Sequence, residues 1–81
     1  MVKKTFEDLR NSILINFKDN KKTINQIASE TGINWKTVER HLTYLMGKKL
    51  VNEVFNSPYV RIFALSEIGI EQVKKLGEKN E

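Results

Sequence analysis

Five apolar residues between positions 6 and 17 recur every three or four residues, which places them on one face of a helix. They are Phe6, Leu9, Ile13, Leu14 and Phe17. Thr5 and the acidic Asp8 stand close to a capping box, so the helix is expected to begin at Thr5. The polar run at 18–22 ends it. We therefore predict a first amphipathic helix whose apolar face lies in the core.

A second and a third helix are predicted directly after the first. Thr23 and Gln26 form a full capping box, which marks the start of the second helix. Gly32 follows its expected end, where a left-handed backbone conformation favours glycine. Asn34 is a good N-cap for the third helix. The apolar faces consist of Ile24, Ile27 and Ala28 in the second helix and Val38, Leu42 and Leu45 in the third.

The pattern then changes to two short runs of strand-forming residues. Segments 50–55 and 60–65 are rich in β-branched and aromatic side chains, and the turn-forming segment 56–59 separates them. This spacing predicts a β-hairpin, beside which residues 23–24 can pair as a short third strand. Ser66 caps a last helix. The buried residues expected in that helix are Ile68, Val73 and Leu76. The order helix, helix, helix, hairpin, helix indicates an α+β fold.

Composition narrows the chemistry that the chain can perform. It has 81 residues, no cysteine and a single histidine, His41, so a zinc site built from protein ligands alone is not expected. No apolar run is long enough to span a bilayer, and the charged start does not resemble a signal peptide. No motif joins a nucleophile to the histidine, and there is no glycine-rich phosphate loop. We therefore expect a cytoplasmic protein that is not an enzyme and carries no metal or cofactor.

The charge distribution favours an anionic partner. The formal net charge is +4 and the isoelectric point about 9.5. Residues 34–65 carry five basic side chains against two acidic ones, whereas the segment from Ser66 onward carries three against four. The cationic surface is therefore expected around the third helix and the hairpin rather than on a tail.

Several short segments together resemble a known family. Ala28, Gly32 and Val38 stand at the spacing of a helix-turn-helix motif. The apolar supports of that motif would be Ile27, Ile33 and Leu42. Segment 37–45, followed by Leu-Val at 50–51, resembles the recognition helix and first wing strand of winged helix-turn-helix transcription regulators of the ArsR and MarR-like groups. Segment 63–69 resembles the y-x-L-T-x-x-G passage from the last wing strand into the next helix.

The resemblance implies both a fold and a function. It covers about residues 5–76 and implies a three-helix core, a two-stranded β-hairpin wing and a C-terminal helix in one domain. In a single domain over 1–81, the helix-turn-helix would occupy 23–48, the wing 50–65 and the C-terminal helix 66–79. The function implied is sequence-specific binding of double-stranded DNA by a transcription regulator, with helix 34–48 in the major groove.

Two departures from the family pattern bear on this interpretation. Family members usually place a glycine just before the Leu-Val that opens the wing, but here Gly47 comes earlier and Lys48 and Lys49 fill the gap. The wing is short and carries one basic residue, Arg61. The metal-sensing members use cysteine or clustered histidine and carboxylate ligands, which this sequence lacks, so metal sensing is not implied.

The third helix has a polar face opposite its apolar one. Because each residue advances a helix by about 100°, Lys36, Arg40 and Thr43 point almost directly away from the core side. Arg40 is suited to a bidentate contact with O6 and N7 of a guanine, and hydroxyl groups beside it can bond phosphates or base edges. Asn34 and Trp35 stand at the N-terminus of the helix, the end that helix-turn-helix proteins place in the groove.

Residues outside this face would hold flanking phosphates. The backbone N–H groups at 23–25 open the second helix and are natural phosphate ligands. Lys48, Lys49 and Arg61 add positive charge on either side, so binding should weaken steeply as salt rises. The expected DNA contacts are Thr23, Asn25, Asn34, Trp35, Lys36, Thr37, Arg40, Thr43, Tyr44, Lys48 and Arg61.

Plainer roles and other functions stay open for the same residues. The basic helix face is also consistent with ordinary solvated surface. His41 is expected to be packed or hydrogen-bonded, Glu39 to be solvated or in a salt bridge, and Trp35 to be partly buried. The same fold also serves as a protein interaction module without DNA binding, or binds RNA. A reader of left-handed DNA is disfavoured, because Glu39 and Thr43 stand where that group has asparagine and tyrosine.

The first and last helices also predict self-association. Small helix-turn-helix proteins usually bind paired half-sites as dimers. Both terminal helices carry more apolar residues than one small core requires. We therefore expect a homodimer, and the candidate interface residues are Phe6, Ile13, Ile70 and Val73.

Overall fold

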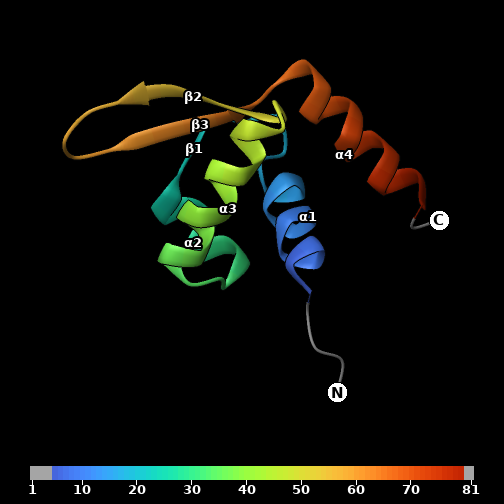
Figure 1. The fold of residues 1–81 in the computed structure, drawn as a ribbon, viewed down its shortest axis with the longest axis horizontal. Helices are drawn as coiled ribbons and strands as arrows, with labels where there is room; N and C mark the ends of the chain where they lie inside the picture. The colour runs from blue at the N-terminus through green and yellow to red at the C-terminus, as the bar shows by residue number, and fades with distance from the viewer. Residues whose placement is uncertain (1–4, 80–81) are drawn as a thin grey trace.

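The computed structural model describes residues 5–79, which form four helices and a three-stranded sheet (Figure 1). The elements are α1 (Phe6–Asn16), β1 (Lys22–Thr23), α2 (Ile24–Thr31), α3 (Trp35–Gly47), β2 (Val51–Asn56), β3 (Arg61–Leu65) and α4 (Glu67–Lys79). Helices α1, α2 and α3 pack on one side of the sheet, the β2–β3 hairpin projects to one end and α4 lies at the other (Figure 1). The predicted order of helices and strands is confirmed.

Three helices begin where a side chain caps the backbone. Thr5 Oγ1 accepts a hydrogen bond from the backbone N–H of Asp8, whose carboxylate accepts one from the N–H of Thr5. Thr23 and Gln26 form the same reciprocal pair at the start of α2. Asn34 Oδ1 accepts from two backbone N–H groups in the first turn of α3. Each cap satisfies backbone N–H groups that have no partner within the helix, so the positions where these helices begin could be predicted from the sequence.

The turn after α3 explains the missing glycine. Leu50 N–H donates to the carbonyl of Leu45 at 3.0 Å and Lys49 N–H donates to that of Met46 at 2.9 Å, the two bonds of a Schellman motif. Lys49 consequently has a left-handed backbone with φ of 63°. That conformation is the one in which glycine is normally favoured. The family's glycine is thus replaced by a lysine in the same conformation.

The sheet joins the hairpin to the start of α2. Its order is β1-β3-β2 and both pairings are antiparallel. The third strand forms at Lys22–Thr23, one residue earlier than predicted, with Thr23 opposite Ile62. The wing turn spans 57–60 rather than 56–59, because Ser57 N–H donates to the Val60 carbonyl at 2.9 Å.

One core lies between the three helices and the sheet. Its buried residues are Ile13, Leu14, Phe17, Ile24, Ile27, Val38, Leu42, Leu45, Val51 and Phe63. A buried cation borders it, since Lys22 is only 8% exposed. Lys22 Nζ lies 2.6 Å from the carbonyl oxygen of Asn16 and 2.5 Å from Glu30 Oε1, which connects the end of α1 to α2. The sequence did not predict this contact, because nothing local distinguishes Lys22 from its neighbouring lysines.

Two apolar residues predicted to be buried are exposed. Phe6 is 67% exposed in the first turn of α1, where its ring contacts His41 and the Arg10 guanidinium but no residue of the core. Ile68 is 57% exposed, because α4 packs through Gly69 and Val73, with Gly69 against Leu50 and Leu65, and turns Ile68 away. The helical spacing of apolar residues identified the apolar face of each helix. It did not show how much of that face the neighbouring elements cover.

His41 is packed and hydrogen-bonded, as predicted. It is buried between α1 and α3, and its Nδ1 accepts a hydrogen bond from Arg10 Nε at 3.3 Å. The Phe6 ring meets it edge-on with ring centroids 5.5 Å apart. Burial, and after it the positive charges of Arg10 and Arg40, hold the pKa of His41 below its ordinary value.

Helix α4 is anchored to the turn after α3. Ser66 Oγ donates to the Lys49 carbonyl at 2.6 Å and accepts from Gly69 N–H at 3.0 Å, while Ser66 N–H donates to the Leu50 carbonyl at 3.0 Å. Gly69 lies so close to Leu50 that an added Cβ would overlap the carbonyl oxygen and lie 3.0 Å from the carbonyl carbon. The glycine of the y-x-L-T-x-x-G passage is therefore required by backbone contact.

We expect Gly69→Ala to destabilise the fold by about 2 kcal/mol, because the methyl group forces α4 away from the turn after α3. Urea unfolding measures the change. Gly77→Ala in the same helix is the control, since a Cβ at Gly77 meets nothing within 4 Å. That control should be neutral or stabilising by up to about 1 kcal/mol through helix propensity. Equal effects of the two substitutions would contradict the assigned contact.

We expect the free energy of unfolding to fall as pH drops below about 6.5, the ordinary pKa of histidine. The lowered pKa of folded His41 means that the unfolded chain binds the proton more readily. Above this pH the imidazole is neutral in both states and contributes no pH dependence. Between pH 6.5 and 5.5 the loss is at most about 1.4 kcal/mol. Urea unfolding across this range should show it for the wild type and not for His41→Gln, and parallel profiles would refute the assignment.

Candidate nucleic-acid interface

Helix α3 presents a cationic face opposite a buried one. Val38 and Leu42 are fully buried, whereas Lys36 and Arg40 are exposed. The ion pairs formed among the described side chains, residues 5–77, are Lys22–Glu30, Arg61–Glu39 and Arg61–Glu53, and none of them includes Lys36 or Arg40. Both cations are therefore available to an external anion.

A cleft of about 220 Å³ lies beside the N-terminus of α3. It brings together four of the predicted contact residues, Thr23, Asn25, Trp35 and Arg61, and the wing turn forms its opposite wall. Trp35 is 42% exposed there. The N–H of Thr23 is engaged by the Gln26 side chain, so the phosphate ligands that α2 can still offer are the next two backbone N–H groups.

A second hollow of about 420 Å³ lies between α1, α4 and the C-terminal end of α3. Tyr44 and Lys48 line it together with Arg10 from α1. The guanidinium carbon of Arg10 lies 3.6 Å from the Tyr44 ring centroid, and Lys48 Nζ lies 5.6 Å from the same centroid. The ring of Tyr44 therefore makes a cation–π contact with the Arg10 guanidinium.

Arg10 is a candidate contact that the sequence analysis missed. It extends the positive surface of α3 onto α1, and its Nε is held by His41. No local spacing links Arg10 to Tyr44, because the contact depends on how α1 packs across α3. The only signal in the sequence was the position of Arg10 beside the apolar face of the first helix.

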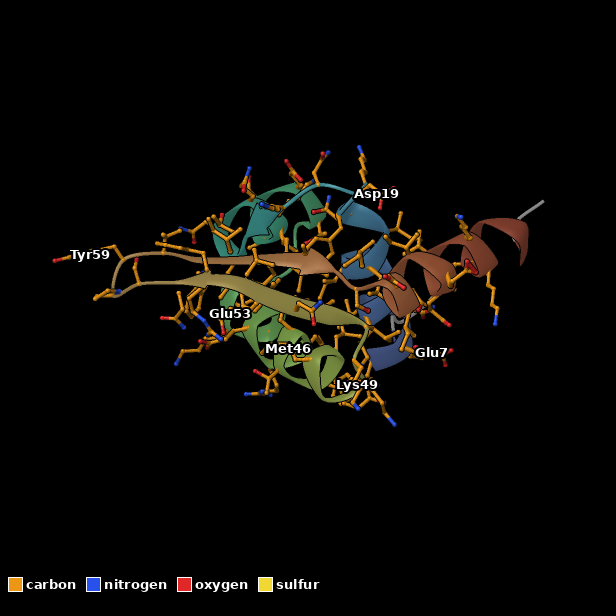
Figure 2. The ribbon with its side chains drawn as sticks, turned by 90° about the horizontal axis from the view of Figure 1, so that it is seen from above. Glu7, Asp19, Met46, Lys49, Glu53 and Tyr59 are labelled. Carbon is orange, nitrogen blue, oxygen red and sulfur yellow. The ribbon has the colours of Figure 1, made fainter. Side chains whose placement is uncertain are left out.

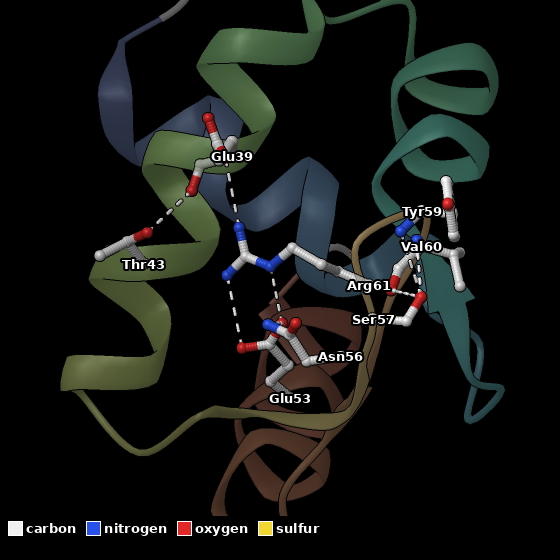
Figure 3. Close-up of polar contacts among 8 residues, drawn as sticks. All are labelled: Glu39, Thr43, Glu53, Asn56, Ser57, Tyr59, Val60 and Arg61. Carbon is white, nitrogen blue, oxygen red and sulfur yellow. Dashed lines mark hydrogen bonds and ion pairs between the residues drawn. The ribbon is translucent and has the colours of Figure 1, made fainter.

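Arg61 is bound by two carboxylates of its own chain (Figure 3). Its Nε donates to Glu53 Oε2 at 2.6 Å, and a terminal nitrogen donates to Glu39 Oε2 at 3.2 Å. The hydrogen bond from Arg61 lowers the pKa of Glu53, and the same bond raises the pKa of Arg61. Arg61 was predicted to hold a flanking phosphate, and the structure shows that its guanidinium already binds two carboxylates. The expected salt-bridge role of Glu39 is confirmed.

Two other predicted contacts are partly engaged within the chain. Asn34 Oδ1 caps α3, which leaves the side-chain amide nitrogen to donate to a ligand. Thr43 Oγ1 donates to the Glu39 carbonyl at 3.1 Å, so its hydroxyl must rotate before it can donate outward (Figure 3). Thr37 is half-buried. The exposed centre of the face consists of Lys36 and Arg40.

The wing differs from the helix face in its chemistry. Tyr59 projects from the tip of the hairpin, far from Lys49 at the end of α3 (Figure 2). Tyr59 is almost fully exposed, and Val54 and Phe55 are exposed along β2. The wing therefore offers aromatic and aliphatic side chains while α3 offers charge.

Membrane-spanning helices and metal-ligand clusters are both absent from residues 5–79. Within that range no helix is long and apolar enough to cross a membrane. The same residues contain no group of three or more histidine, aspartate or glutamate side chains placed to hold a metal ion.

Solved structures that resemble this chain include proteins crystallised with and without DNA. An apo mutant form of ZitR from Lactococcus lactis superposes with a TM-score of 0.80 at 19% identity, over 93% of this chain and 58% of that one. FabT from Streptococcus pneumoniae, in complex with DNA, gives 0.79 at 17% identity, over 89% and 52%. The chain thus spans a little over half the length of both proteins. At these identities the comparison establishes the winged-helix fold, which confirms the fold predicted from the sequence.

A smaller domain matches over its full length. The Zα domain of PKZ from Carassius auratus, in complex with Z-DNA, gives a TM-score of 0.63 at 26% identity, over 76% of this chain and 100% of that one. A search of curated protein sequences finds no match.

The family assignment comes from the sequence itself. The family model described as "Bacterial regulatory protein, arsR family" matches residues 7–53, which is more than half of the chain and contains α1, α2, α3 and the start of the hairpin. The chain therefore belongs to the arsR family of bacterial regulatory proteins.

Proposed function

We propose that this chain binds double-stranded DNA sequence-specifically as a transcription regulator, with α3 in the major groove and the wing across the adjacent backbone. The observation that carries the proposal is the exposed pair Lys36 and Arg40, which lies opposite a fully buried helix face and has no carboxylate partner within residues 5–77. The family assignment and the DNA complex of FabT support it.

The proposed DNA contacts fall into three groups along α3. Arg40 has the geometry for bidentate recognition of a guanine, and Lys36 lies one turn earlier on the same face. Lys48 and Arg10, both beside Tyr44, supply charge for the backbone at the C-terminal end of α3. Trp35 and the first N–H groups of α2 line the cleft at the other end, where a sugar and its phosphate can lie.

We expect Lys36→Ala combined with Arg40→Ala to reduce affinity for duplex DNA by tenfold or more in about 50 mM salt. The slope of log K against log salt should become shallower by about 0.9 for each phosphate that the variant no longer neutralises. Fluorescence anisotropy with a labelled duplex from a random-pool selection measures both quantities. Lys21→Ala with Lys75→Ala is the matched control, because it removes the same charge from exposed positions outside α3 and outside the hollow beside Ile70.

The rival functions give different results in the same assay. A protein interaction module would show no salt-sensitive binding by the wild type. An RNA-binding protein would prefer duplex RNA in competition. A reader of left-handed DNA, the ligand of the Zα domain, would bind a Z-form duplex more tightly than the same sequence in B-form. Equal reductions in both double variants would mean that only net charge matters.

We also propose that the chain is a homodimer joined through α4. Of the predicted interface residues, Ile13 is 0% exposed and is excluded, because it is already part of the monomer core. Ile70 and Val73 are half-buried and line a hollow beside the end of α1. An apolar strip on a terminal helix is a surface that a second copy can cover.

We expect sedimentation equilibrium at micromolar concentration to show a dimer that Ile70→Glu converts to a monomer. The introduced carboxylate would be buried without a partner in the interface. Val54→Glu is the control, since Val54 is an exposed apolar residue on the wing. A monomeric wild type would remove the proposal, and a dimer unaffected by Ile70→Glu would place the interface elsewhere.

A further inference from the structure

Arg61 makes three side-chain hydrogen bonds, one of which connects the wing to α3. Two go to Glu53 on the neighbouring strand, at 2.6 Å to Oε2 and 3.4 Å to Oε1, and the third goes to Glu39 on α3 at 3.2 Å (Figure 3). The guanidinium also lies over the ring of the buried Phe63, 5.1 Å from its centroid. Glu53 thus holds the guanidinium through two hydrogen bonds and Glu39 through one, and the ring of Phe63 packs against it.

These contacts leave little of Arg61 for a phosphate. Glu53 and Glu39 together carry two negative charges against the single positive charge of Arg61, so the cluster is net negative at neutral pH. A phosphate approaching the guanidinium would meet both carboxylates at close range. The cluster therefore differs from Lys36 and Arg40, which stand on α3 without such partners among residues 5–77.

The hydrogen bond from Arg61 to Glu39, here called the bridge, can hold the wing because of where Arg61 lies in the sheet. The last pair between β1 and β3 is Thr23 with Ile62, so β3 extends past β1 at Arg61. Beyond that point β3 pairs with β2 alone. The bond from Arg61 to Glu39 spans from this overhanging part of the wing to the middle of α3.

We propose that Arg61 is a positioning residue that fixes the angle between the wing and α3 and does not contact a phosphate. Its guanidinium reaches both carboxylates at once, which the single ammonium of a lysine cannot do with the same geometry. Glu39 is the end of this bridge on α3 and is unavailable to read a cytosine. The consequence for DNA binding rests on the proposed function, but the consequence for the wing does not.

The first measurement uses the free protein. Backbone ¹⁵N order parameters should fall from about 0.85 toward 0.6 at residues 56, 57, 59 and 60 in both Arg61→Gln and Glu39→Ala. The double variant should fall no further than Arg61→Gln alone, because that substitution already removes the bond to Glu39. Arg61→Lys should give an intermediate decrease. Lys36→Gln, which removes an unpaired cation from the same helix, should leave the wing unchanged. Order parameters that stay at the wild-type level in Arg61→Gln would overturn the proposal.

The second measurement uses DNA. Arg61→Gln should weaken binding about three- to tenfold while the slope of log K against log salt stays within about 0.3 of the wild type. Lys48→Gln, which removes a cation proposed to contact the backbone, should make the slope shallower by about 0.9. A decrease of about 0.9 in slope for Arg61→Gln would show a phosphate contact and overturn the proposal. If the wild type binds no duplex, the proposed function fails, and the order parameters still decide whether Arg61 positions the wing.

Discussion

The orientation of α3 depends on the burial of its apolar face. Val38, Leu42 and Leu45 are buried almost completely against the core, and such side chains each contribute about 1.5–3 kcal/mol. A surface ion pair contributes about 0–1 kcal/mol, so no pairing of Lys36 or Arg40 could rotate the helix against that burial. The two cations are exposed because the opposite side of the helix is fixed. His41 adds to this constraint as a buried, neutral acceptor for Arg10.

The charges of the molecule are arranged in two different ways. Lys22 and Arg61 are held by carboxylates of the same chain and connect elements of the fold. Lys36, Arg40 and Lys48 are exposed on and beside α3 and take part in none of the ion pairs formed by residues 5–77. The net charge of +4 therefore does not distinguish the basic side chains that are held in ion pairs from those that are exposed to an external anion. Four of the eight exposed basic side chains among residues 5–77 lie on one helix and its C-terminal turn.

Features determined by neighbouring residues in the chain could be predicted, and features determined by packing could not. The caps at Thr5, Thr23 and Asn34 and the buried face of α3 depend on residues three or four positions apart, and the structure confirms them. The exposure of Phe6 and the bridge from Arg61 to Glu39 depend on where distant elements end. Helical spacing says which side of a helix is apolar, but it does not say whether a neighbour covers it.

The same distinction applies to the candidate interface. Lys36 and Arg40 were identified by their spacing from the buried residues of a single helix. Arg10 was missed because its place beside Tyr44 is created by the packing of α1 against α3. The sequence showed that Arg61 was the one basic residue of the wing, but only the structure shows which carboxylates surround it.

Lys49 shows how a backbone conformation can be linked to surface charge. A lysine in the left-handed region costs about 1–2 kcal/mol relative to the right-handed one, a strain that glycine would relieve. Glycine would also leave Lys48 as the single cation directly after α3. Because Lys49 keeps this strained conformation, the rest of the fold must hold the turn firmly. The turn loses some stability and gains a second positive charge. A more stable variant of this domain is therefore available by one substitution, at the expense of its attraction for anions.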